Sequence, residues 1–236
     1  MLLQKLELIV TNIAEVEELL AKSEGGVAEQ KETNVEELDR KINEEKEKIT
    51  GHIEKLGSEA LMSKATPFGT ALDELAKAKK KFDESVKRLN QYKSYQEILE
   101  INPTPIKEVE DFTKKFEVRQ KLWKNRERFA ELSRHWYYDY FTEMDSNEIV
   151  QIVKDFEKDN LVLKQQLPRD VKDEVLEQLQ QEVKVVSQHC NLISALGNKN
   201  MQARHWAKIF ALLESGAPPA NTKQFSFQQL LSEGID

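Results

Sequence analysis

The sequence predicts an all-α protein made of elongated helical bundles, with at most a short β element near the C-terminus. Apolar residues recur at spacings of three and four along most of the 236 residues, which is the period of one helix face. Charged residues make up 33% and hydrophobic residues 39%, against about 25% and about 45–50% in ordinary domains. The 8 glycines and 6 prolines are too few for the closely spaced turns of a sandwich or barrel.

Three antiparallel helices are expected in the first hundred residues. The first covers residues 2–20, whose apolar residues have the a/d spacing of a coiled coil. Two consecutive glycines then predict a loop at residues 23–33, after which Asn34 is the expected N-cap of a second helix. A third helix is expected to start at Thr66-Pro67, because proline is favoured at the first helical position.

A linker is predicted at residues 102–105, because the two prolines of Asn-Pro-Thr-Pro exclude a continuous helix. We therefore expect one helical domain at residues 1–102 and a second, richer in aromatic residues, at residues 103–236.

Four further helices are expected in this second half. The first is a long aromatic helix from Pro105 to Tyr140, and the second is capped at residues 145–148 and stops before Pro168. The third runs from Val171 and is closed by Gly197 as its C′ residue. The fourth covers residues 201–212 and is ended by residues 216–219. The Phe-Ser-Phe sequence at 225–227 alternates as a short strand does. Ser226 and Gln229 offer a capping box for a last helical turn.

The charge is distributed unevenly along the chain. The net charge is −7 overall, with −8 over residues 1–76, +6 over residues 77–128 and −5 over residues 129–236. A basic middle segment could attract a microtubule or a nucleic acid. Acidic residues are interspersed within it, which favours the simpler interpretation that it faces the acidic segments on either side. No apolar run is long enough to span a bilayer.

No catalytic, cofactor-binding or metal-binding residue is predicted. The sequence contains neither G-x-G-x-x-G nor G-x-x-x-x-G-K-[ST], the motifs of phosphate-binding loops. The single cysteine, Cys190, excludes an internal disulfide. The adjacent His189 and Cys190 point about 100° apart on a helix, so they cannot easily share one zinc ion.

The tripeptide Arg-His-Trp occurs twice, at residues 134–136 and 204–206. A tryptophan on a helix, with an apolar residue three or four positions on, is typically a packing anchor. The predicted structural anchors are Trp123, Trp136, Arg204, His205 and Trp206. The alternative, that these residues form a docking surface, stays open.

Four stretches carry a family resemblance. They are QKLW at 120–123 with Phe129 and Trp136, MDSNEI at 144–149, the run from residue 192 to Trp206 that ends in Arg-His-Trp, and FSFQQLLSEGI at 225–235. With them, residues 120–236 resemble the linker region of dynein heavy chains. The resemblance implies that the chain is a fragment, namely the tail end and the first part of the linker.

In dyneins the linker is a helical rod that lies across a ring of AAA+ modules and bends as the ring hydrolyses ATP. The resemblance therefore implies a non-catalytic lever. Its implied partners are the AAA+ ring of the same heavy chain and other dynein heavy, intermediate or light chains, with no nucleic acid and no membrane. The implied location is the cytoskeleton, in a ciliary axoneme rather than the cytoplasm. The coiled-coil spacing leaves one alternative, a spectrin-like scaffold that mediates protein–protein interaction.

Overall fold

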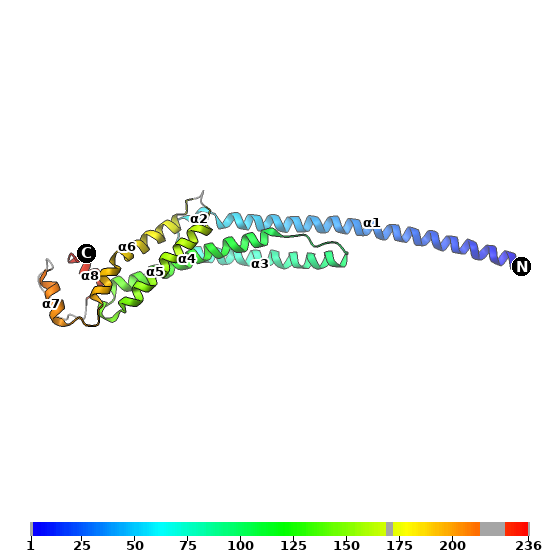
Figure 1. Ribbon diagram of the computed structural model, residues 1–236. Coiled ribbons are helices and arrows are strands. Elements are labelled where there is room, and N and C mark those ends of the chain that lie inside the picture. Colours follow the sequence, from blue (N-terminus) through cyan, green and yellow to red (C-terminus); the bar gives the residue numbers. More distant parts are fainter. Residues whose placement is uncertain (1, 169–171, 213–224, 236) are drawn as a thin grey trace. The chain divides into compact units, whose positions relative to one another are not determined.

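The computed structural model describes residues 2–168, 172–212 and 225–235, and for residues 2–11 the backbone alone (Figure 1). Its α-helices are α1 (Leu2–Leu56), α2 (Glu59–Met62), α3 (Phe68–Ile98), α4 (Lys107–Tyr138), α5 (Ser146–Gln166), α6 (Glu174–Leu196), α7 (Ala203–Leu212) and α8 (Phe227–Ser232). A 3-10 helix, η1, covers Phe141–Glu143. Within the described ranges the β structure is limited to one isolated bridge. The all-α prediction is therefore confirmed.

The chain forms two compact units. Unit 1 comprises the residues up to 53 and residues 78–112, and unit 2 comprises residues 54–77 and 113–236. Helices α1, α3 and α4 each contribute residues to both units. The domain boundary expected between residues 102 and 103 stays a prediction.

Unit 1 has a core of aliphatic and aromatic side chains from α1, α3 and the start of α4. The buried residues are Leu38, Ile42, Ile49, Phe82, Leu89 and Phe112. Phe82 and Phe112 stack with their ring centroids 4.0 Å apart. Within this core the carboxylate of Glu45 accepts a hydrogen bond from Lys48 Nζ at 2.7 Å and forms an ion pair with Arg88, whose Nε lies 2.9 Å away. The charge at this core position of α1 is therefore paired with a residue of α3.

Helix α1 is continuous through residues 23–33, where the sequence predicted a loop, so Asn34 is not an N-cap. The glycine signal was outweighed for two reasons. The residues around Gly25 and Gly26 include alanine, glutamate, glutamine and lysine, which are strong helix formers. Extending an existing helix also costs far less than nucleating a new one.

Unit 2 contains α2, the first turns of α3, most of α4 and all of the later helices. Helices α5 and α6 pack against each other, and each is capped by an aspartate. Within the predicted capping segment 145–148 the cap is Asp145, which accepts hydrogen bonds from the backbone N–H groups of Asn147 and Glu148. Asp173 does the same for Val175 and Leu176. The predicted start of α6 at residue 171, and the expected end of α7 at residues 216–219, lie outside the described residues.

Gly197 ends α6 as predicted, but not as a left-handed C′ residue. Its φ is −79°, which any residue adopts. What requires glycine is proximity, because a Cβ at this position would lie 2.3 Å from both Cβ and Oγ of Ser146, the first residue of α5. The glycine therefore lets the end of α6 approach the start of α5.

The Phe-Ser-Phe segment forms no strand. Ser226 makes an isolated antiparallel bridge with Tyr140, and the Phe141 N–H donates to the carbonyl of Phe225 at 2.9 Å. Helix α8 begins at Phe227, the last residue of this segment, and the predicted capping box of Ser226 and Gln229 is present. The side-chain hydrogen bonds of this capping box set the backbone for the start of a helix, so the segment does not continue as a strand. Tyr140, the expected last residue of the long aromatic helix, lies beyond the end of α4 at Tyr138 and is 44% exposed.

Candidate functional site

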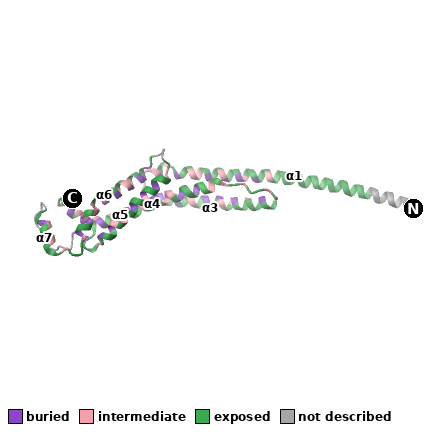
Figure 2. Ribbon diagram, in the orientation of Figure 1, coloured by how far each residue is buried: buried purple, intermediate pink, exposed green. Residues whose placement is uncertain are grey.

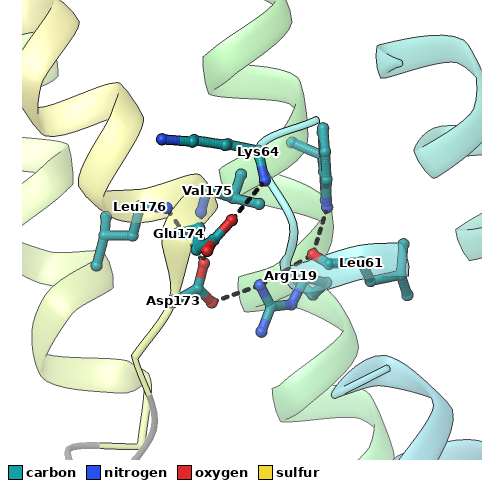
Figure 3. Close-up of polar contacts among 8 residues, drawn as sticks. Leu61, Lys64, Arg119, Asp173, Glu174, Val175 and Leu176 are labelled. Atoms are coloured by element: carbon teal, nitrogen blue, oxygen red, sulfur yellow. Dashed lines mark hydrogen bonds and ion pairs between the residues drawn. The ribbon is translucent and has the colours of Figure 1, made fainter. Parts of the chain in front are cut away.

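A polar cluster inside unit 2, here called the clamp, consists of Leu61, Arg119, Trp123 and Asp173. Figure 3 shows the contacts of Arg119 with Leu61 and Asp173. Trp123 on α4 is fully buried, and its indole Nε1 donates a hydrogen bond to the Leu61 carbonyl at 3.1 Å. Arg119, one turn earlier on α4, donates from Nη1 to the same carbonyl at 3.4 Å and to Asp173 Oδ2 at 2.5 Å. The clamp thus joins α2, α4 and the start of α6.

Asp173 has two tasks in the clamp. Its Oδ1 accepts from the backbone N–H groups of Val175 and Leu176, at 3.1 and 3.2 Å, and so caps α6. Its Oδ2 pairs with Arg119, and both side chains are 7% exposed. An N-cap carboxylate is favoured by the helix dipole, and a buried carboxylate needs a counter-charge. The guanidinium therefore makes a buried aspartate tolerable at this helix start.

Arg126 extends the same contacts along α4. Its Nη2 donates to the Lys64 carbonyl at 2.9 Å, and its guanidinium lies 5.4 Å from the centroid of Phe68 and 5.5 Å from that of Trp123. Burial lowers the pKa of Arg126. The Lys64 N–H in turn donates to Glu174 at 3.4 Å. The segment between α2 and α3 is therefore bonded to both α4 and α6.

Sequence reasoning identified Trp123 and missed Arg119 and Asp173. A signal for Arg119 was present, because it lies three residues after Phe116 and four before Trp123, in register with the apolar face of α4. A charged residue at such a position predicts a buried ion pair. Its partner is 54 residues away, and no local pattern points to it.

A second cluster, here called the aromatic cluster, consists of Phe141, Trp206, Phe210, Phe225 and Phe227. All five are buried. Trp206 on α7 meets Phe225 edge-on at 4.6 Å between centroids, and Phe225 meets Phe210 at 5.7 Å. Phe141 of η1 lies 6.5 Å from Trp206 and 5.7 Å from Phe227. The cluster therefore joins η1, α7 and α8 through aromatic contacts.

The aromatic cluster continues onto α4 and α6. Tyr137 and His189 each lie within 6 Å of the Phe227 centroid, at 5.8 and 5.7 Å. The Tyr137 hydroxyl contacts His189 Nδ1 at 3.1 Å. Burial, with a smaller effect of Cys190, raises the pKa of Tyr137, so the phenol stays protonated and can donate to the imidazole.

The two polar members of the second Arg-His-Trp tripeptide lie at the surface. Arg204 is exposed and His205 is partly exposed, whereas Trp206 is 5% exposed. His205 Nδ1 accepts from the Gln202 N–H at 3.1 Å, and Arg204 Nε lies 3.3 Å from His205 Nε2. A neutral imidazole has one acceptor nitrogen, so the two bonds exclude each other. The shorter one holds the first turn of α7.

Trp136 belongs to neither cluster. It is buried and contacts Phe129 edge-on at 5.9 Å, and Phe129 contacts Phe156 of α5 at 5.0 Å. The three predicted tryptophan anchors therefore lie in three separate sets of contacts, one at the clamp, one between α4 and α5, and one at α7.

A cleft of about 770 Å³ lies beside the aromatic cluster. Its lining comes from residues 140–147, from residues 196–199, and from Met201, Ala203 and Trp206.

Among the residues that the structure describes, no group of three or more His, Cys, Asp or Glu side chains could hold a metal ion. Burial raises the pKa of the Cys190 thiol, which disfavours the reactive thiolate. In the same part of the chain, no helix has the length and apolar character to cross a membrane.

Two comparisons with known proteins agree with each other. A family model described as dynein heavy chain, N-terminal region 2, matches residues 109–236, which is more than half of the chain. The chain is also similar to dynein axonemal heavy chain 6 of Homo sapiens, with 28% identity over 123 residues. That alignment covers 52% of the chain and 3% of the relative, so the chain spans a small part of the protein that it matches.

Proposed function

The chain belongs to the dynein heavy chain family, and from this premise we propose that it is a non-catalytic part of the motor's mechanical linker. In this proposal residues 103–236 are the first part of the lever, and residues 1–102 are the helical segment that leads into it from the tail. The lever transmits ATP-driven changes of a AAA+ ring, elsewhere in the same heavy chain, to the tail. Family membership favours this role over a free-standing scaffold.

The clamp is the observation that carries the proposal. A lever has to transmit force without bending between its helices. Packed side chains alone allow small sliding movements between helices, whereas directional hydrogen bonds fix the register. In the clamp, one carbonyl accepts two hydrogen bonds from α4, and one carboxylate joins α4 to the first turn of α6. This arrangement supports a stiff element.

The proposal also covers partners and location. The ring of the same heavy chain is the partner that a lever requires, and other dynein chains are further candidates. The matched relative is an axonemal heavy chain by name, which supports our proposal that the chain acts in the axonemal cytoskeleton.

The test replaces one member of the aromatic cluster in a full-length heavy chain that contains this region. We expect Trp206→Ala to lower microtubule gliding velocity by a larger factor than basal ATP turnover, because a softened lever uncouples the ring from the tail. Leu212→Ala is the matched control, since Leu212 lies on the same helix and is 87% exposed. Equal loss of velocity and turnover in the Trp206 variant would contradict the proposal.

A further inference from the structure

Beyond the lever, the first helix carries an apolar stripe that unit 1 leaves uncovered. Ile13, Val16, Leu20 and Val27 are 53%, 54%, 55% and 67% exposed. Their spacings of three, four and seven place them on one face of α1. Figure 2 shows this part of α1 as exposed, and no other segment of unit 1 lies beside it.

The stripe continues a face that is buried further along the same helix. Leu38 follows Val27 by eleven residues, which is three turns to within about 20°. Leu38, Ile42 and Ile49 are 6%, 3% and 0% exposed, and Glu45 between them pairs with Arg88 of α3. The face of α1 is therefore covered where α3 runs beside it and exposed beyond the last residue of α3, Ile98.

The covering ends in an open apolar groove. This groove, about 300 Å³ in volume, is lined from α1 by Leu38 and Lys41 and from the end of α3 by Tyr92, Tyr95 and Ile98. Tyr95 is 52% exposed and Ile98 76%. A helix laid on the stripe would also reach this groove and cover these two side chains, so groove and stripe form one continuous surface.

The negative charge of residues 12–33 favours a basic partner helix over a second copy of the chain. Residues 12–33 contain six glutamates and two lysines, a net charge of −4. In heptad notation Ile13 and Leu20 occupy a positions and Val16 a d position. Glu17 and Glu24 then occupy e positions beside the stripe, where the helices of a coiled coil form salt bridges with each other. A second copy would bring two acidic segments together, whereas a partner with basic flanks would neutralise them.

We propose that residues 12–33 of α1, together with the groove at the end of α3, dock a basic amphipathic helix of another protein. The partner helix has an apolar a/d stripe and lysine or arginine at its e and g positions. The expected complex is a two-stranded coiled coil that continues the packing of α1 with α3.

The test uses the full chain and two synthetic helical peptides of 28 residues that share the same leucine a/d stripe. One has lysine at all e and g positions and the other has glutamate, so that neither peptide pairs with itself. In fluorescence anisotropy at low salt, we expect the lysine peptide to bind at least about tenfold more tightly than the glutamate peptide, with the difference shrinking at high salt. Equal binding of the two peptides, or no binding of either, would overturn the proposal.

Two sets of substitutions locate the contact. Replacing Ile13, Val16, Leu20 and Val27 by serine should abolish binding of the lysine peptide, whereas the matched control Ala14→Ser with Ala21→Ser and Ala28→Ser, at the b positions, should leave it unchanged. Reversing charge with Glu17→Lys and Glu24→Lys should switch the preference to the glutamate peptide. Circular dichroism checks that each variant keeps its helix content.

The oligomeric state provides an independent check. We expect the chain alone to sediment as a monomer, because its stripe lies in an acidic segment. A dimer that the stripe serines dissociate would assign the stripe to a second copy and overturn the proposal.

Discussion

Gly197 should not tolerate even one added methyl group. A Cβ at residue 197 would lie 2.3 Å from Cβ and Oγ of Ser146 and 3.0 Å from the carbonyl oxygen of Ile193. Carbon atoms in contact normally lie about 3.5–4.0 Å apart. Gly197→Ala therefore creates an overlap of more than about 1 Å, which only a movement of the surrounding atoms can relieve.

The cost of this movement follows from what surrounds the two residues. Ser146 is 5% exposed and is the first residue of α5, which its neighbour Asp145 caps. Ile193, in the last turn of α6, is 2% exposed. Neither helix end can retreat without disturbing buried contacts. Overpacking costs about 1–3 kcal/mol, and we expect a value of about 2–3 kcal/mol for the free energy of unfolding of unit 2.

Urea unfolding followed by tryptophan fluorescence measures this cost. All three tryptophans lie at positions within unit 2, so the signal reports that unit. Ser146→Gly removes both atoms of the overlap, whereas Ser146→Ala keeps the Cβ. We therefore expect Ser146→Gly to restore most of the stability lost by Gly197→Ala, and Ser146→Ala to restore much less.

Two results would refute this reasoning. One is a Gly197→Ala protein that is as stable as the wild type. The other is equal rescue by the two serine substitutions, which would show that the space between α5 and α6 is not what constrains Gly197.

Three further predictions concern the clamp, unit 1 and the segment between α3 and α4. Arg119→Leu should destabilise unit 2 by about 3–5 kcal/mol, because it leaves the buried carboxylate of Asp173 without its counter-charge. Adding Asp173→Ser, which keeps an N-cap oxygen, should recover part of the loss in urea unfolding. Burial acts to raise the pKa of Glu45, but hydrogen bonds from Arg88, Lys48 and Ser85 outweigh it and lower that pKa. The ionised Glu45 carboxylate should therefore stabilise the folded state fully above the ordinary glutamate pKa of about 4.3. This stabilisation should be lost as the pH falls through the lowered pKa, which acid unfolding followed by circular dichroism can measure. Limited proteolysis should cut first within residues 99–106, which join α3 to α4 without forming a helix.

Each of these predictions has an outcome that contradicts it. Strictly additive effects of the two clamp substitutions would show that Arg119 and Asp173 do not interact. A Glu45→Gln protein with the acid profile of the wild type would remove Glu45 from the pH dependence. First cuts inside α4 would contradict both the proteolysis prediction and the proposed boundary near residue 102.

Features determined by neighbouring residues could be predicted from the sequence. Asp145 precedes an apolar helical pattern, and Ser226 stands three residues before Gln229. Both form the expected caps, because a cap depends on four or five consecutive residues. Trp206 was expected to pack, and it is buried, although its role as a mechanical anchor stays a prediction.

Features that depend on distant residues could not be predicted. The partner of Arg119 lies 54 positions further along the chain. The reason for glycine at 197 is Ser146, on another helix. The loop expected at residues 23–33 failed for the opposite reason. There a local signal was real, but it was weaker than the helix propensity of the residues around it.

Substitutions should be tolerated unequally on the two sides of the contacts that the clamp and Arg126 make. Arg119, Trp123 and Arg126 all donate to main-chain carbonyls, those of Leu61 and Lys64. Every residue type supplies such a carbonyl, so the identity of residue 64 can vary while its hydrogen bond persists. The donors on α4 have no equivalents among the other amino acids, since an indole N–H and a planar guanidinium each have a fixed geometry. A mutational scan should therefore find a permissive position at Lys64 facing three restrictive positions on α4.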